Sequence, residues 1–377
     1  MKTKDFFSKY KLIIGIVIPV CLILVFMFFL AQDSNIGKAI NELNQCENKE
    51  QVKSTFDKYK EVLTIINDKN EREIDKNFLK FVREKLASFN LSEDEINTCK
   101  SWLPPAPTSL NLIIVPDLSR RIIDSVNNPD QIINDTIILN HIWNVFEKHT
   151  RLKKNSRDRL IVDVTDEEQA TGRFRTLANN LIFDLSEHKK EQTNRLYFTD
   201  SIRNRYTESI KQLYGLAKRN PLGADYFKYF KDKLLRHIQK STLFDNYKNV
   251  LIIITDGYLE SEENLYTGGY NRRNNVARAI QQGRPIAEAL NGLRIPNTNQ
   301  NFPTLEVLIL EITERRPGSI EEPYDDGTSE DYDILKALWS DWFRRMQIRN
   351  DNDFFIRRND ATKLTKEAIN GFLDIVN

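Results

Sequence analysis

The chain has 377 residues and a formal net charge of +1, with 40% apolar and 29% charged residues. This composition fits one large globular domain with accessory segments, and the balanced charge argues against nucleic acid as a partner. Three cysteines without a C-x-x-C pair and four scattered histidines argue against a zinc ribbon, a thioredoxin-like site or a histidine metal cluster.

The first predicted element is a transmembrane helix over residues 12–31, which contain no charged side chain. Twenty residues at a helical rise span a hydrocarbon core of roughly 30 Å. The run ends without the small-x-small motif of a cleaved signal peptide, so we expect an uncleaved signal anchor.

The charges before this run predict its orientation. Residues 1–11 carry four lysines and one aspartate, and the positive-inside rule keeps such a tail in the cytoplasm. We therefore expect a single-pass protein of a bacterial inner membrane, with a cytoplasmic N-terminus and a periplasmic or otherwise extracytoplasmic main domain.

Residues 32–103 predict an α-helical stalk. Apolar residues recur at spacings of three and four, chiefly over 54–66 and 71–89, as in amphipathic helices. Cys46 and Cys99 lie near the two ends of the stalk. In an oxidising compartment they could form a disulfide, and the alternative is two unpaired thiols.

A Pro-rich linker follows over residues 104–109, with three prolines in four residues. Prolines at this density stop a helix and favour a stiff extended connector. The main domain is therefore predicted over 110–377.

The main domain alternates strand and helix patterns. The predicted strands are 110–115, 159–164, 195–198, 249–255, 305–312 and 354–356. The predicted helices are 130–148, 171–186, 201–218, 224–240, 275–291, 331–348 and 361–376. This alternation predicts an α/β fold: a doubly wound, mostly parallel sheet with helices on both faces.

Two long connections interrupt the pattern. Residues 257–303 are rich in Gly, Asn, Arg and Tyr and follow a predicted strand, so we expect them to shape a binding face. Residues 317–333 are strongly acidic and predict a solvated loop.

Candidate site residues follow two predicted strands. Asp117 and Ser119 follow the apolar run 110–115, and Asp256 follows the run 250–254 within the sequence Thr-Asp-Gly. Open α/β sheets place ligand sites at the carboxyl ends of their strands. Carboxylate and hydroxyl oxygens are ligands for hard divalent cations, so these residues outline a cation site.

This order of motifs resembles the von Willebrand factor type A (vWA) domain with its metal-ion-dependent adhesion site. The family carries D-x-S-x-S after the first strand, a Thr just after a Gly before a central helix, and T-D-G after the fourth strand. The corresponding stretches here are Asp117–Arg121, Gly223–Asp225 and Thr255–Gly257. The resemblance covers about 110–377, with an apparent insertion between Arg151 and Asn220, and it implies a vWA/Rossmann-like fold.

Two ligand positions depart from the family pattern. Arg121 stands where the second serine is expected, and Ala224 replaces the threonine. One alternative is a degenerate site in which Asp117, Ser119 and Asp256 bind Mg²⁺, or Mn²⁺ or Ca²⁺, with Asp225 in place of the threonine. The other is a metal-free site in which the aspartates pair with Arg121.

The resemblance implies a binding module rather than an enzyme. A membrane-anchored vWA-like domain would bind a protein partner through a carboxylate that completes the metal site. A metal-independent scaffold subunit of a membrane complex is the alternative, and a carboxylate-based metal-dependent hydrolase is a third. The sequence contains no P-loop, no G-x-G-x-x-G after a strand and no histidine–nucleophile pair beside the site.

Overall fold

The structure is a computed structural model. It describes residues 35–67, 70–154, 156–165, 173–188, 193–259, 278–279, 282–284, 294–315, 331–348, 355–358 and 362–373. The chain divides into two compact units: unit 1 comprises residues 1–107 and 241–246, and unit 2 comprises 108–240 and 247–377. The short segment 241–246 belongs to unit 1 although it lies far along the sequence.

Unit 1 is mostly helical, with its own apolar core. Its named helices are α2 (Lys49–Tyr59), α3 (Lys76–Ala87) and α4 (Glu93–Lys100). The side chains of Asn48, Asp75 and Ser92 cap their first turns, and Ser92 forms a capping box with Glu95. Leu243 packs into the same core, which explains why its segment belongs to this unit.

The prediction that this region is wholly helical is wrong at one point. An antiparallel hairpin joins β1 (Thr64–Ile66) to β2 (Arg72–Ile74). The β-branched residues of β1 favour a strand, and Asn70 adopts a left-handed φ of 64° in the turn. Cys46 and Cys99 are both buried free thiols, so the structure has the second of the two predicted cysteine states.

Unit 2 contains a six-stranded sheet in the order β5-β4-β3-β6-β7-β8. The strands are β3 (Thr108–Pro116), β4 (Arg159–Val162), β5 (Ile182–Asp184), β6 (Asn246–Ile254), β7 (Leu305–Ile312) and β8 (Phe355–Arg358). The pairs β3–β4, β6–β7 and β7–β8 are parallel, whereas β4–β5 is antiparallel. The predicted α/β class with a mostly parallel sheet is confirmed.

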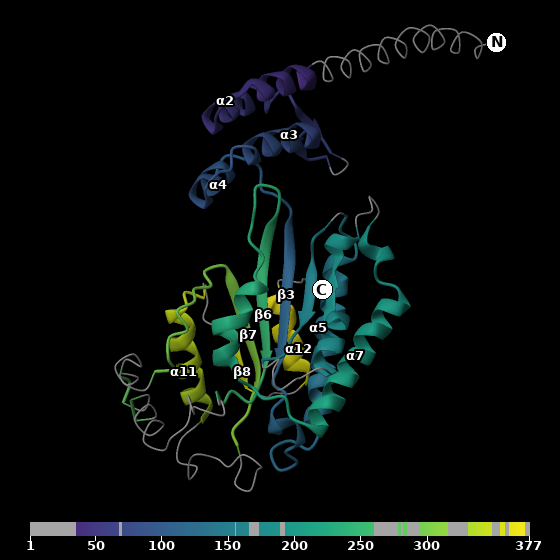
Figure 1. The fold of residues 1–377 in the computed structure, drawn as a ribbon, viewed down its shortest axis with the longest axis vertical. Coiled ribbons are helices and arrows are strands. Elements are labelled where there is room, and N and C mark those ends of the chain that lie inside the picture. The colour runs from purple at the N-terminus through teal and green to yellow at the C-terminus, as the bar shows by residue number, and fades with distance from the viewer. Residues whose placement is uncertain are drawn as a thin grey trace, which may run out of the picture. The chain divides into compact units, whose positions relative to one another are not determined.

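Two apolar cores, one against each face of this sheet, hold the helices of unit 2 (Figure 1). The first core contains residues of α5 (Gln131–Thr150), α7 (Asp200–Arg219) and α12 (Thr362–Phe372). The second contains residues of α11 (Asp331–Arg345) and of the segment 226–236. Alternate residues of β3 enter opposite cores, because successive side chains of a strand point to opposite faces.

Two predicted elements are wrong. The predicted strand 195–198 is replaced by a 3-10 turn over Asn194–Leu196, where the buried Asn194 amide donates hydrogen bonds to Thr150 and Ser156. The predicted helix 171–186 ends early: α6 covers Arg173–Ala178, and the chain then forms β5. Leu181, Phe183 and Leu185 are buried at a spacing of two, which suits a strand.

The predicted helix 224–240 is a succession of short helical turns. α8 (Tyr226–Lys228) continues into a π-helical turn over Tyr229–Lys233 and a 3-10 turn over Leu234–Arg236. Tyr229, Lys233 and His237 all reach the carboxylate of Asp163, at 3.3, 2.6 and 2.9 Å. Through these irregular helical turns, Tyr229, Lys233 and His237, which are four residues apart, all contact the same buried carboxylate.

Several predicted elements lie wholly or largely outside the described residues: the run 12–31, most of 257–303 with most of the helix 275–291, and nearly all of 317–333. Within the ranges given above, no helix is both long and apolar enough to cross a membrane.

The strand order creates a switch point between β3 and β6. The chain leaves β3 toward β4 on one side and leaves β6 toward β7 on the other. Ligands of open α/β sheets bind where the connections diverge in this way. On the neighbouring strand, Glu311 near the end of β7 has a φ of 72°, at a shift in the β7–β8 register.

Candidate functional site

The carboxyl ends of β3 and β6 bring Asp117 and Asp256 to the same edge of the sheet. The backbone amide of Asp117 donates a hydrogen bond of 2.8 Å to the carbonyl of Ile254, which fixes the two strand ends together. Both aspartates are buried, with exposed fractions of 1% and 8%. The sequence correctly located these residues at one buried edge.

Both carboxylate oxygens of Asp117 already have partners. Oδ1 accepts a hydrogen bond from the backbone amide of Ser119 at 2.9 Å, and Oδ2 accepts one from the Thr255 hydroxyl at 2.8 Å. The Arg121 Nε atom lies 3.5 Å from Oδ2 and donates to the Asp117 carbonyl at 3.2 Å. This carboxylate is therefore held by the protein itself.

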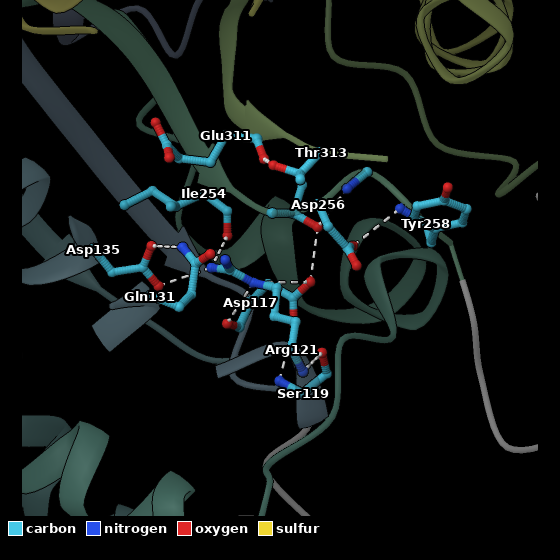
Figure 2. Close-up of polar contacts among 12 residues, drawn as sticks. Asp117, Ser119, Arg121, Gln131, Asp135, Ile254, Asp256, Tyr258, Glu311 and Thr313 are labelled. Atoms are coloured by element: carbon cyan, nitrogen blue, oxygen red, sulfur yellow. Dashed lines mark hydrogen bonds and ion pairs between the residues drawn. The ribbon is translucent and has the colours of Figure 1, made fainter. Parts of the chain in front are cut away.

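Arg121 is buried at the centre of the site. Its Nη2 atom lies 2.8 Å from Oδ2 of Asp135 and donates to the Ile254 carbonyl at 3.1 Å. Figure 2 shows the guanidinium group among Asp117, Asp135 and Ile254. Burial lowers the pKa of Arg121, but the negative charges of Asp135 and Asp117 raise it by more. The pKa is therefore above its ordinary value, and the guanidinium group stays cationic.

Asp135 is fully buried on α5 and completes this arrangement. Gln131 and Tyr214 donate hydrogen bonds to its two oxygens, at 2.7 and 2.9 Å. Burial raises the pKa of Asp135, whereas Arg121 lowers it. Asp135 was not predicted as a site residue, although a carboxylate on the apolar stripe that contains Ile138 and Leu139 is a usable signal.

Asp256 has a different arginine. The Arg315 Nε atom lies 3.3 Å from its Oδ2, and the Tyr258 amide donates to its Oδ1 at 3.3 Å. Arg315 is itself buried, and its guanidinium carbon lies 4.1 Å from the Tyr258 ring centroid. Burial raises the pKa of Asp256 to about 6, against the opposing effect of Arg315. Arg315, three residues beyond β7, was not predicted as a site residue.

Gly257 permits the turn that follows Asp256. Its φ is 96°, a conformation that side chains strongly disfavour, and a Cβ atom would collide with Ile312. Its carbonyl accepts a hydrogen bond of 2.8 Å from the Trp339 indole. The turn is thus fixed both by its backbone and by the packing around it.

The remaining predicted ligands lie close by but have other contacts. Ser119 is half-buried, and its hydroxyl accepts a hydrogen bond from the Arg121 amide at 3.4 Å. Asp225 caps α8 by accepting from the Lys228 amide at 2.9 Å. A backbone bridge joins Leu118 to Gly223, which brings the segment containing Ala224 and Asp225 to this edge of the sheet.

Three exposed apolar side chains lie on the segment that follows the site in the chain. Directly after Ser119, a 3-10 turn over Arg120–Ile123 leads to α5. Ile123, Val126 and Ile133, which we call the carboxyl-edge surface, have exposed fractions of 38%, 42% and 58%. Asp124 fixes the turn between them, because its carboxylate accepts a hydrogen bond from the Val126 amide at 3.0 Å.

The donor set can be compared with the needs of a metal ion. Among the residues that the structure describes, no group of three His, Cys, Asp or Glu side chains is arranged to hold one.

No protein-family model matches the chain. A search of curated proteins likewise finds no match.

Proposed function

We propose that unit 2 is a vWA-like domain that binds a protein partner at the carboxyl edge of its sheet without a bridging cation. The observation that supports this most strongly is the pairing of two of the three predicted metal-ligating aspartates with buried arginines. Asp117 pairs with Arg121, and Asp256 pairs with Arg315. The uncharged run 12–31 would anchor the protein in a membrane.

The contacts of the aspartates fit guanidinium groups better than a divalent cation. A cation bound by Asp117 would approach the positive charge of Arg121 and would compete with the hydrogen bonds from Ser119 and Thr255. Asp225 contributes its carboxylate to a helix cap. We therefore assign the aspartates a structural role, in which they hold the loops that present the surface above them.

The carboxyl-edge surface supplies the contact. Ile123, Val126 and Ile133 expose apolar area on a segment whose turn is fixed by Asp124. Exposed apolar side chains on a pre-formed segment are suited to protein binding, because their burial requires little further ordering of the backbone. This proposal corresponds to a binding or scaffold role and involves no catalysis.

A second candidate function is adhesion through Mg²⁺. The raised pKa of Asp256 favours it, because burial leaves this carboxylate incompletely compensated by Arg315. In that case Asp117, Ser119 and Asp256 would hold the ion, and a carboxylate of the partner would complete its coordination. The two candidates differ in their response to a chelator.

Site-specific photo-crosslinking of the full-length chain in its own cells tests the proposal. A benzophenone amino acid replaces Ile123 or Ile133, and the control replaces Leu364, which is 44% exposed on α12. We expect one defined protein adduct from the first two positions, unchanged by EDTA, and none from the control.

Two results would count against this proposal. Loss of the adduct in EDTA would support the Mg²⁺ candidate instead. Absence of an adduct at both isoleucines, or the same adduct at Leu364, would show that the carboxyl-edge surface is not the binding face.

A further inference from the structure

The opposite end of unit 2 presents two exposed leucines on adjoining segments. Leu152 and Leu196 have exposed fractions of 77% and 52%. α5 begins beside the candidate site, and α7 leads back to it, so the end of α5 and the start of α7 lie at the opposite end of the unit. Figure 1 shows these two helices side by side. Leu152 follows the end of α5, and Leu196 precedes the start of α7. Neither leucine belongs to an apolar core or to the carboxyl-edge surface.

Hydrogen bonds join the two segments. Lys154 and Thr193 form a backbone bridge, and the backbone N–H of Asn194 donates to the Lys153 carbonyl at 2.8 Å. The Asn194 side chain, fully buried, also donates to Thr150 and Ser156. The two leucines are therefore held on one pre-formed surface.

This surface is basic although the whole chain is nearly neutral. Residues 151–158 and 193–197 contain five basic side chains and one acidic one. The acidic residue, Asp158, is buried, where it accepts hydrogen bonds from Lys153 and from the Leu110 amide. The exposed basic residues of these two segments are Lys154, Arg157 and Arg195.

The surface also lies where the chain enters unit 2. Lys153 donates to the carbonyl of Thr108, the first residue of the unit, at 3.5 Å. The Arg157 amide donates to the Ser109 hydroxyl at 3.1 Å. The leucines and their basic neighbours are thus fixed to the first residues after the N-terminal part of the chain.

We propose that this surface, defined by Leu152, Lys154, Arg157, Arg195 and Leu196, docks on an anionic lipid bilayer. Exposed leucines can enter the boundary between head groups and acyl chains, while lysine and arginine side chains pair with anionic head groups. Docking would orient unit 2 with its carboxyl-edge surface turned away from the lipid. The inference goes beyond the proposed function and does not depend on it.

Hydrogen–deuterium exchange of the full-length chain tests the proposal. The chain is mixed with vesicles of phosphatidylcholine alone or of phosphatidylcholine with phosphatidylglycerol. We expect amides of 150–157 and 193–197 to exchange more slowly with the anionic vesicles than with phosphatidylcholine alone. The affinity for the anionic vesicles should rise by about fivefold for each basic side chain near the surface. High salt should remove the difference.

Matched variants locate the effect. Replacing Lys154, Arg157 and Arg195 by Glu should abolish the protection. The control replaces Lys211, Lys218 and Arg219 by Glu, which changes the net charge equally on exposed positions of α7. Protection should survive in the control.

The leucines have a separate test. The double change Leu152→Ser and Leu196→Ser should weaken the protection, whereas Ile133→Ser at the opposite edge should not. Equal exchange with both vesicle types, loss of protection in the α7 control, or full protection without the two leucines would overturn the proposal. The lysines of residues 1–11 also favour anionic lipid, so the readout is the local protection of 150–157 and 193–197 and its loss in the matched variants.

Discussion

The side chains of Arg121 and Arg315 decide the electrostatics of the candidate site. Each is buried, and each neutralises a carboxylate at the end of a central strand. A buried ion pair adds little net stability compared with an apolar pair, but removing one partner leaves an uncompensated charge. The site is therefore sensitive to changes at either arginine.

The first prediction concerns Arg121. Arg121→Ala should lower the free energy of unfolding by about 3–5 kcal/mol, because Asp135 and Asp117 lose their buried counter-charge. Denaturant unfolding measures the change. The exposed neighbour Arg120 is the matched control, and Arg120→Ala should change stability by less than about 0.5 kcal/mol. Equal effects of the two changes would contradict the assigned pairing.

The second prediction concerns the pH dependence that Asp256 contributes. Its pKa in the folded protein is about 6, above the ordinary value of 3.8. The folded state therefore takes up this proton before the unfolded state does, and stability from this group rises as the pH falls from about 6 to about 4. Over that window wild type should gain about 2–3 kcal/mol relative to Asp256→Asn.

Chemical denaturation of both proteins across this pH range provides the measurement. Above about pH 7 the difference between wild type and Asp256→Asn should be constant. Parallel curves throughout the range would show that Asp256 titrates as an ordinary carboxylate, contrary to its buried position.

Sequence predicted some of these residues and missed others for a physical reason. Asp117 and Asp256 follow long apolar runs, so local pattern alone places them at strand ends. Asp135 and Arg315 acquire their roles from tertiary contacts with Arg121 and Asp256. Such pairings join positions far apart in the chain and leave little local signal.

At the scale of elements, long central strands were predictable and short or irregular elements were not. β3, β6 and β7 are buried over most of their length and contain the apolar runs 112–115, 250–254 and 307–310. β5 has three residues and depends on its antiparallel pairing with β4. The π-helical turn over Tyr229–Lys233 follows from contacts with Asp163, which sequence periodicity does not reveal.

The third prediction tests the turn between β6 and the site. Gly257→Ala should cost about 1–3 kcal/mol, because the new methyl group meets Ile312 and the positive φ is strained. Gly215 on α7 is the control, since its added Cβ meets nothing within 4 Å. Gly215→Ala should stabilise the protein by about 0.5–1 kcal/mol. Thermal or denaturant unfolding should show opposite signs, and equal signs would contradict the assigned role of Gly257.

At the scale of the whole molecule, the chain combines two compact units with a predicted anchor. The apolar cores of the two units are distinct, and segment 241–246 joins unit 1 by packing Leu243 into its core. The assignment of segment 241–246 to unit 1 was not predicted, because a six-residue segment is too short to show a hydrophobic periodicity that would assign it to either unit. The run 12–31 remains a prediction from sequence.

The fourth prediction tests the anchor. Full-length protein should stay in the membrane pellet after carbonate extraction, because twenty uncharged residues are long enough to span the bilayer. A chain that begins at Gln32 should be released to the supernatant. Recovery of the full-length protein in the supernatant would contradict the predicted anchor.

The central claim is that arginines, rather than a divalent cation, neutralise the aspartates of the adhesion-like site. Thermal unfolding of the full-length protein in detergent, with increasing Mg²⁺ or with EDTA, tests it most directly. We predict that the melting temperature of wild type is the same in both. The double change Arg121→Ser and Asp135→Asn, which removes the buried pair and restores the family's hydroxyl, should gain a saturable response. That response would be about 1.4 kcal/mol at ten times the Kd. A saturable Mg²⁺ stabilisation of wild type that is lost in Asp256→Asn would contradict the account.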